Sequence, residues 1–174
     1  MNAKYFRFQV NGVKATAIYP YEGRVRSLLF QFKGCYDYEL KDTFLIYQKP
    51  FLQMRFRGYV VAPSPSSKAH DDERGFNHVR EMFACLGLPM ILALEKTSDQ
   101  KQTTLNYFER QKVGERIRYI GPKSLSGKKI LLVDDVFTTG ATMKACLRLL
   151  RKHHPKAIQI LVMAKTIDPP ISFP

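Results

Sequence analysis

Two adjacent carboxylates and a threonine-rich turn stand within one short stretch, "KKILLVDDVFTTGAT", which covers residues 128–142. The apolar run "ILLV" leads directly into Asp134 and Asp135, which therefore fall at the end of a predicted buried strand. The turn Thr138–Thr142 then opens a segment with helical spacing. Because a helix N-terminus offers unsatisfied N–H groups and a partial positive charge, this turn suits a phosphate.

The carboxylates suit a different chemical group. Asp134 and Asp135 are hydrogen-bond acceptors without donors, so they fit a pair of vicinal hydroxyls or the oxygen shell of a metal ion. Gly140 lets the backbone approach a ligand closely, and the threonine hydroxyls add donors. A phosphate on one side and a diol on the other together describe a ribose 5-phosphate.

Apolar runs and amphipathic segments alternate along most of the chain. The predicted strands cover residues 58–65, 90–94, 128–133 and 157–164, and the predicted helices cover residues 76–86 and 141–152. The second of these helices carries an apolar stripe made of Ala145, Cys146, Leu149 and Leu150. This alternation predicts an α/β fold, a Rossmann-like parallel sheet flanked by helices. Ligands of such sheets bind beyond the carboxyl ends of the strands.

The N-terminal part has a different pattern. Asn11-Gly12 separates two alternating runs, residues 5–10 and 13–19, and predicts a β-hairpin with a type I′ turn. Helices are predicted over residues 23–33 and from Tyr38 to Gln48, the second ending before Pro50. Residues 96–120 are polar and basic, and they predict a flexible excursion.

Composition narrows the class of protein. The chain has 174 residues, which suits one domain, and 45% of them are hydrophobic. The N-terminus lacks a signal-peptide core, so we expect a cytoplasmic protein without a membrane span. The three cysteines include no C-x-x-C pair, so no zinc is expected. A net charge of +13 favours a polyanionic partner, although a solvated basic surface explains it equally well.

The stretch "ILLVDDVFTTGAT" resembles the signature of the type I phosphoribosyltransferases, a strand, two acids and a Thr-Thr-Gly-x-Thr loop. The resemblance implies that Asp134 and Asp135 are the catalytic acids, which contact the ribose hydroxyls of phosphoribosyl pyrophosphate directly or through Mg²⁺. It also implies a 5-phosphate loop, which consists of Thr138, Thr139, Gly140, Ala141 and Thr142.

A closer resemblance is to the ComF (ComFC-like, GntX-like) branch of that superfamily. Pro63-Ser64-Pro65 precedes Arg74-Gly75-Phe76-Asn77 at the spacing of the branch, and "YEGRVRSLLFQFKG" places Lys33 at its lysine position. The likeness runs from about Tyr19 to Lys165. It implies one domain over residues 1–174, with the N-terminal hairpin and helices in 1–57 and the core in 58–167, where about 96–120 form a flexible hood. Members usually begin with a four-cysteine zinc ribbon, which this chain does not contain.

Several further residues are candidates with alternatives. Ser66, Ser67, Lys68 and Ala69 form a candidate pyrophosphate loop, or else a plain surface loop. Arg74 contacts the ligand or forms a salt bridge with Asp71 or Glu73. The remaining candidates for ligand or DNA contact are Lys33, Lys101 and Arg110. Tyr107 and Phe108 stack bases of single-stranded DNA or anchor a lid, while His70 and His78 are expected to be structural or solvated.

The resemblance predicts a phosphoribosyltransferase that binds phosphoribosyl pyrophosphate with Mg²⁺ and acts in DNA uptake during natural competence. Two alternatives stay open. One is a non-catalytic module on the same fold that binds single-stranded DNA or a competence helicase. The other is a base-salvage phosphoribosyltransferase without a role in competence.

Overall fold

A five-stranded sheet organises the protein. The computed structural model describes residues 3–97 and 117–167. The strands lie in the order β1 (Phe6–Val10), β2 (Val13–Pro20), β7 (Ala157–Lys165), β6 (Lys129–Phe137) and β3 (Tyr59–Pro63). Strands β2, β7, β6 and β3 are mutually parallel, and only β1 is antiparallel to its neighbour. The predicted α/β architecture is confirmed.

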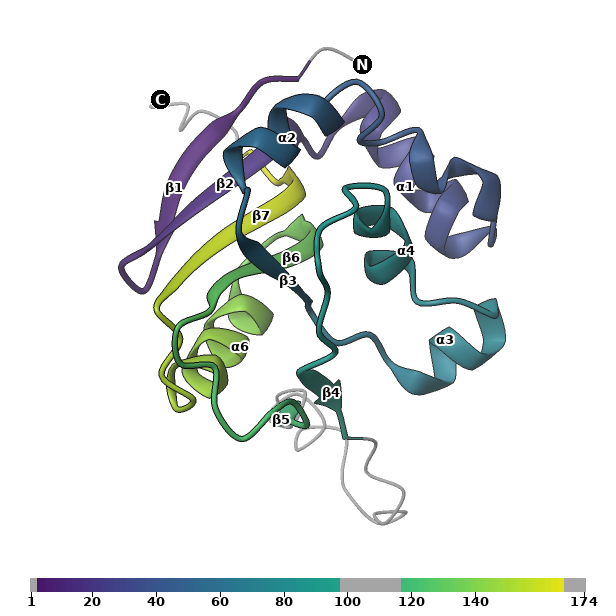
Figure 1. Ribbon diagram of the computed structural model, residues 1–174. Coiled ribbons are helices and arrows are strands. Elements are labelled where there is room, and N and C mark those ends of the chain that lie inside the picture. The colour runs from purple at the N-terminus through teal and green to yellow at the C-terminus, as the bar shows by residue number, and fades with distance from the viewer. Residues whose placement is uncertain (1–2, 98–116, 168–174) are drawn as a thin grey trace, which may run out of the picture.

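Helices cover both faces of this sheet (Figure 1). One face packs against α1 (Gly23–Gly34), α2 (Lys49–Arg55) and α4 (His78–Ala84), and the other packs against α6 (Ala141–Arg151). A short 3₁₀ helix, η1 (Tyr38–Asp42), follows α1, and α3 (Lys68–Arg74) precedes α4. Each face holds its own buried apolar cluster. The sheet is therefore fixed from both sides, which keeps the ends of its strands in place.

The pleat of β6 sends alternate side chains to opposite faces. Leu131 and Val133 belong to the apolar cluster under α1, α2 and α4, whereas Ile130 and Leu132 belong to the cluster under α6. This alternation reaches Asp135 and ends there, because Val136 packs against the same cluster as Leu131 and Val133. Asp134 accordingly belongs to the α6 side, and Asp135 belongs to the side of α1 and α4.

The predicted N-terminal hairpin is confirmed. Val10 pairs with Val13 across the turn, and Asn11 and Gly12 have φ values of 48° and 77°. Two positive φ values in succession are what a type I′ turn requires, and Asn-Gly adopts them at low cost. Phe8 packs against the apolar cluster under α6, and its ring centroid lies 4.7 Å from that of Phe137.

The helix predicted over Tyr38–Gln48 is wrong. The structure has η1 there, followed by turns, and the helix α2 begins at Lys49 with Pro50 in its first turn. Proline lacks an N–H, but the first turn of a helix leaves its N–H groups unbonded anyway. Pro50 therefore starts a helix instead of ending one.

The strand predicted over residues 90–94 is reduced to a single bridge between Met90 and Val61. The chain then enters a separate two-stranded antiparallel sheet of β4 (Leu94–Lys96) and β5 (Ile117–Tyr119). These strands are the ends of the predicted hood, whose residues 98–116 lie outside the described part of the chain. None of the described helices is long and apolar enough to cross a bilayer.

The apolar stripe predicted on the last helix is partly wrong. The buried residues of α6 are Met143, Cys146, Leu147 and Leu150. Ala145 and Leu149 are only half-buried, so the buried face is rotated away from the predicted stripe. The helix itself and its position after the threonine-rich turn are as predicted.

Candidate functional site

The end of β6 has a neighbouring strand on one side only. Strand β3 pairs with β6 as far as Pro63 opposite Val133, and the N–H of Ser64 donates to the carbonyl of Val133 at 2.8 Å. Beyond this point β3 leaves the sheet, whereas β6 continues along β7. Asp134 and Asp135 thus lie in a crevice at the carboxyl ends of the strands, where open α/β sheets bind ligands.

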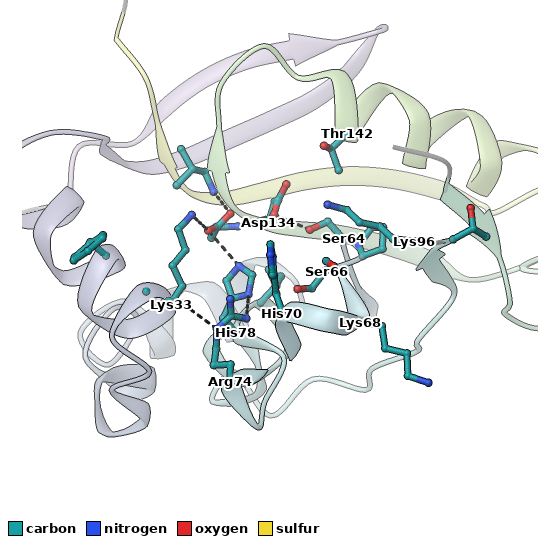
Figure 2. A pocket seen from close by; sticks show the side chains of 18 residues that line it. Lys33, Ser64, Ser66, Lys68, His70, Arg74, His78, Lys96, Asp134 and Thr142 are labelled. Carbon is teal, nitrogen blue, oxygen red and sulfur yellow. Dashed lines mark hydrogen bonds and ion pairs between the residues drawn. The ribbon is translucent and has the colours of Figure 1, made fainter. Parts of the chain in front are cut away.

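A cavity of about 720 Å³ opens at this crevice. Its walls come from α1, the β3–α3 connection, α3, α4, β4 and the first turn of α6. Figure 2 shows Lys33 and His78 approaching on one side of Asp134, with Thr142 on the other side. The polar residues that line the cavity are Lys33, Ser64, Ser66, Ser67, Lys68, His70, Arg74, His78, Lys96, Thr97, Asp134, Asp135 and Thr142.

Asp134 is held through one carboxylate oxygen. Its Oδ1 accepts a hydrogen bond from the Ser64 hydroxyl at 2.6 Å and another from the backbone N–H of Asp135 at 3.0 Å. Burial, together with the charge of Asp135, raises the pKa of Asp134 to about 8. No donor from the described residues reaches Oδ2 of Asp134. Half-buried at the edge of the cavity, Asp134 keeps an acceptor for a ligand.

Asp135 is the more buried of the two acids, and it has two basic partners. Its Oδ2 lies 2.8 Å from Nζ of Lys33 and 3.3 Å from Nε2 of His78, while Oδ1 accepts from the N–H of Val136 at 2.7 Å. Burial alone would raise the pKa of Asp135, but the hydrogen bond from His78 and the charge of Lys33 outweigh it and hold the pKa well below its ordinary value.

Arg74 organises these partners from α3. Its Nε donates to the backbone carbonyl of Lys33 at 3.0 Å, and its Nη1 lies 3.3 Å from Asp71 and 3.0 Å from Nδ1 of His78. Arginine can only donate, so Nδ1 of His78 accepts and Nε2 carries the hydrogen that points to Asp135. The predicted salt bridge between Arg74 and Asp71 is confirmed, and the guanidinium is engaged by the protein.

The Arg74-Gly75-Phe76-Asn77 motif connects α3 to α4. Gly75 ends α3 with a φ of +79°, and the side chain of Asn77 accepts from the N–H of Arg80 and caps α4. Asn77 also donates to Asp71 at 2.9 Å, which receives the Ser66 hydroxyl at 2.6 Å. The motif therefore fixes the loop at Ser66 and the position of His78 at the same time.

The threonine-rich turn needs a glycine for two reasons. Gly140 has a φ of +74°, and a Cβ at this position would lie 2.6 Å from the ring of Phe137. The carbonyl of Gly140 accepts the first helical bond of α6, from Lys144 at 2.9 Å. Thr142 lines the cavity from the first turn of this helix. The other four residues of the turn lie outside the cavity lining.

Comparisons with known proteins identify the family. The family model of the phosphoribosyl transferase domain matches residues 74–170, just over half of the chain. The chain belongs to the phosphoribosyl transferase domain family. The sheet with its flanking helices is the type I phosphoribosyltransferase fold that the sequence predicted.

The ComF resemblance is confirmed as well. The chain is 31% identical to competence protein ComFC of Bacillus subtilis over 77% of its length and 56% of that protein. It is 26% identical to competence protein ComFC of Streptococcus pneumoniae over 88% of its length and 69% of that protein. The chain thus spans little more than half of the Bacillus protein.

A solved hypoxanthine phosphoribosyltransferase from Staphylococcus aureus is similar to 78% of the chain and to 71% of its own length, at 13% identity and a TM-score of 0.46.

The candidate pyrophosphate loop lies at the cavity in part. Ser66, Ser67 and Lys68 line it, whereas Ala69 lies in the first turn of α3 and does not. Figure 2 shows the side chain of Lys68 directed away from Asp134. Lys33 lines the cavity through its contact with Asp135. Lys101 and Arg110 lie outside the described residues, as do Tyr107 and Phe108.

Two contacts of the acids are not evident in the sequence. His78 is expected to be structural or solvated, and its structural contact is with Asp135. The sequence does offer one signal for this histidine. It directly follows the Arg-Gly-Phe-Asn motif, which itself follows the candidate loop at Ser66. Ser64, buried between two prolines, was not singled out and binds Asp134. His153 stacks on Tyr119 with ring centroids 3.5 Å apart.

Proposed function

We propose that the cavity binds phosphoribosyl pyrophosphate and that the protein is a ComF-type phosphoribosyltransferase. One observation carries this proposal: Asp134 lies in an open crevice that also receives Thr142 from the N-terminus of α6 and Ser66 and Ser67 from the β3–α3 connection. If the diol of a sugar lies at the acids, the start of α6 offers an anion site on one side of the sugar. The β3–α3 connection offers a second group of hydroxyl donors. A pentose with a phosphate at one end and a pyrophosphate at the other carries its groups in this order.

The acids and the turn have separate roles in this proposal. Asp134 accepts from the ribose hydroxyls, and Thr138, Thr139, Gly140, Ala141 and Thr142 hold the 5-phosphate at the start of α6. Ser66, Ser67 and Lys68 face the pyrophosphate. In the reaction a nitrogen of the acceptor bonds to the anomeric carbon while the bond to pyrophosphate breaks, and the pyrophosphate leaves with the bonding electron pair. The carboxylates favour the positive charge that develops on the sugar ring.

The donor set fits Mg²⁺ that arrives with the substrate. The described residues contain no group of three His, Cys, Asp or Glu side chains that could hold a metal ion alone. Magnesium in phosphate sites is commonly bound by one or two carboxylates together with substrate oxygens. Asp134 would supply the protein's part, and the ion would neutralise charge on the leaving pyrophosphate.

A role in competence is the biological part of the proposal. It is supported by the matches to the two competence proteins ComFC, in which the likeness extends over most of this chain. Residues 1–174 would act as one domain, located in the cytoplasm. Expression of the chain in Bacillus subtilis that lacks its own ComFC tests this role: restored transformation supports it, and no restoration of an expressed, folded chain contradicts it.

Isothermal titration calorimetry with phosphoribosyl pyrophosphate and Mg²⁺ tests the ligand. We expect saturable binding to the wild type, a large loss in Asp134→Ala, and no change in Lys123→Ala, which alters an exposed lysine outside the cavity lining. Absence of binding to the folded wild type would reject the proposal. Release of pyrophosphate with a panel of nitrogen bases then tests whether the protein is a transferase.

A second candidate function, nucleic-acid binding, is favoured by the distribution of charge. The edge of the sheet where β2, β3, β6 and β7 begin is strongly basic and lies opposite the cavity. Its exposed basic residues are Lys14, Arg55, Arg57, Lys128, Lys129, Arg151, Lys152 and Lys156. No acidic residue is present in the described ranges 3–21, 43–70, 117–133 and 136–167, from which this edge is built. Such an edge suits the phosphates of single-stranded DNA.

The affinity for a labelled oligonucleotide at several salt concentrations tests this function. We expect binding that weakens steeply with salt, and a smaller salt slope in Lys128→Glu with Lys156→Glu, whose backbones are joined by a 2.8 Å hydrogen bond. Lys68→Glu, which changes the charge at the cavity instead, is the matched control. A flat response to salt would reject nucleic-acid binding at this edge.

A further inference from the structure

The protein itself satisfies the carboxylate of Asp135. Oδ1 accepts the N–H of Val136, and Oδ2 receives both Lys33 and His78. Only 11% of the side chain of Asp135 is exposed. Asp134 differs, because the donors among the described residues, Ser64 and the N–H of Asp135, both reach Oδ1. The two neighbouring acids are therefore not equivalent acceptors for a ligand.

Lys33 is the residue that makes the difference. Its ammonium lies 2.8 Å from Oδ2 of Asp135, which is charge-assisted hydrogen-bond distance, and its side chain is 35% exposed at the cavity wall. A divalent cation bound to this oxygen would have to approach the same point. Because two cations at one oxygen repel each other strongly where water is partly excluded, the ammonium and a metal ion compete.

The ammonium is held in place by the fold. Lys33 lies in the last turn of α1, next to the fully buried Phe32, and its backbone carbonyl accepts from Arg74 at 3.0 Å. Arg74 also contacts His78, the second partner of Asp135. Helix α1 precedes residues 74–170, the part of the chain that matches the phosphoribosyl transferase domain. An element outside the matched region thus contributes a charged group to the acid pair.

We infer that Lys33 is a built-in cation of this site: its ammonium occupies the position at Oδ2 of Asp135 that a divalent cation would otherwise take. Asp134 is then the acid that meets the ligand, and a metal ion enters bound to the pyrophosphate and not to the empty protein. The identity of the ligand rests on the proposed function, but the competition between Lys33 and a free cation does not.

Binding of Mn²⁺ alone, followed by the electron paramagnetic resonance signal of the free ion, tests the inference without any sugar. We expect weak binding to the wild type and at least fivefold tighter binding to Lys33→Met, which removes the ammonium and keeps the length of the side chain. Lys33→Gln serves as a second variant if Lys33→Met does not fold. In folded protein, a gain below fivefold would overturn the inference.

Three further variants locate the effect. Lys33→Arg keeps the positive charge and should bind Mn²⁺ like the wild type. Lys68→Met removes another lysine that lines the cavity but is directed away from Asp134, so it measures the general effect of one lost charge and should change affinity less than twofold. Asp135→Asn added to Lys33→Met should abolish the gain, and persistence of the gain would contradict a site at Asp135.

Failure of the proposed function would look different. If phosphoribosyl pyrophosphate does not bind the wild type while Lys33→Met gains affinity for Mn²⁺, the ligand is wrong and the built-in cation stands. If phosphoribosyl pyrophosphate binds while Lys33→Met shows no such gain, the built-in cation is wrong and the ligand stands.

Discussion

At the end of β6, the two acids lie on opposite faces of the sheet. On the α6 side, Asp134 faces the cavity with Ser64 as its side-chain donor, and its pKa is raised. On the side of α1 and α4, Asp135 is bound by Lys33 and His78, and its pKa is held low. The pleat of a strand separates adjacent side chains in this way.

This difference shows how a pair of identical residues acquires two tasks. Asp135 joins three helices, because Lys33 comes from α1, His78 from α4, and Arg74 of α3 holds both. Asp134 keeps an oxygen for a ligand. A sequence motif with two acids thus contains one acid that builds the site and one that binds at it.

Replacing Asp135 should have the largest effect on stability. Asp135→Ala leaves Lys33 and His78 without their acid and the N–H of Val136 without its acceptor, so we expect the free energy of unfolding to fall by about 2–4 kcal/mol. In a protein of this size that corresponds to a melting temperature lower by about 4–16 °C, measured by calorimetry. A variant as stable as the wild type would remove the structural role of Asp135.

Replacing Asp134 should chiefly affect binding. Above pH 8, where Asp134 is ionised, Asp134→Ala removes a charged acceptor for the ribose hydroxyls, worth about 1.5–3 kcal/mol, or roughly 10- to 150-fold in affinity for phosphoribosyl pyrophosphate. The melting temperature should fall by less than in Asp135→Ala, since Ser64 and one N–H lose their acceptor at the edge of the cavity. If both variants lose stability and affinity equally, the two acids do not have separate tasks.

The α6 side can be probed at Gly140. Gly140→Ala combines a strained φ of +74° with a Cβ 2.6 Å from Phe137, so the turn must shift, and we expect about tenfold weaker ligand binding, or about 1.4 kcal/mol. Gly127→Ala is the matched control, because it has a φ of +76° and nothing within 4 Å of the added Cβ. Equal affinities for the two variants would show that the turn does not hold the phosphate.

The pH dependence of stability should also separate the two acids. The folded state binds the proton of Asp134 more tightly than the unfolded chain, so this group's stabilisation is present at low pH and is lost as the pH rises toward about 8. Asp134→Asn, which does not titrate, should therefore lose less stability than the wild type between pH 5 and pH 8, by on the order of a few kcal/mol. The opposite sign in thermal melts would mean that the pKa of Asp134 is not raised.

Local sequence patterns predict those parts of the fold and site that depend on residues close together in the chain. The strand before Asp134, the Asn11-Gly12 hairpin and the helix after Gly140 each follow from neighbouring residues. The pattern around Pro50 predicts a helix end where the structure has a helix start, because proline is compatible with both.

The division of labour between the acids could not be read from the sequence. Lys33 is 102 positions from Asp135, and only the packing of α1 on the sheet brings the two together. His78 looked like an isolated histidine for the same reason. The pleat does predict that adjacent acids face opposite ways, but which of them meets a basic partner depends on the tertiary structure.

Carboxyl-detected NMR of the aspartate side chains, with and without phosphoribosyl pyrophosphate and Mg²⁺, distinguishes the two acids within one sample. We predict that the ligand shifts the Cγ resonance of Asp134 and lowers its titration midpoint from about pH 8, while the resonance of Asp135 stays in place. A ligand-induced shift at Asp135 with Asp134 unchanged would contradict it.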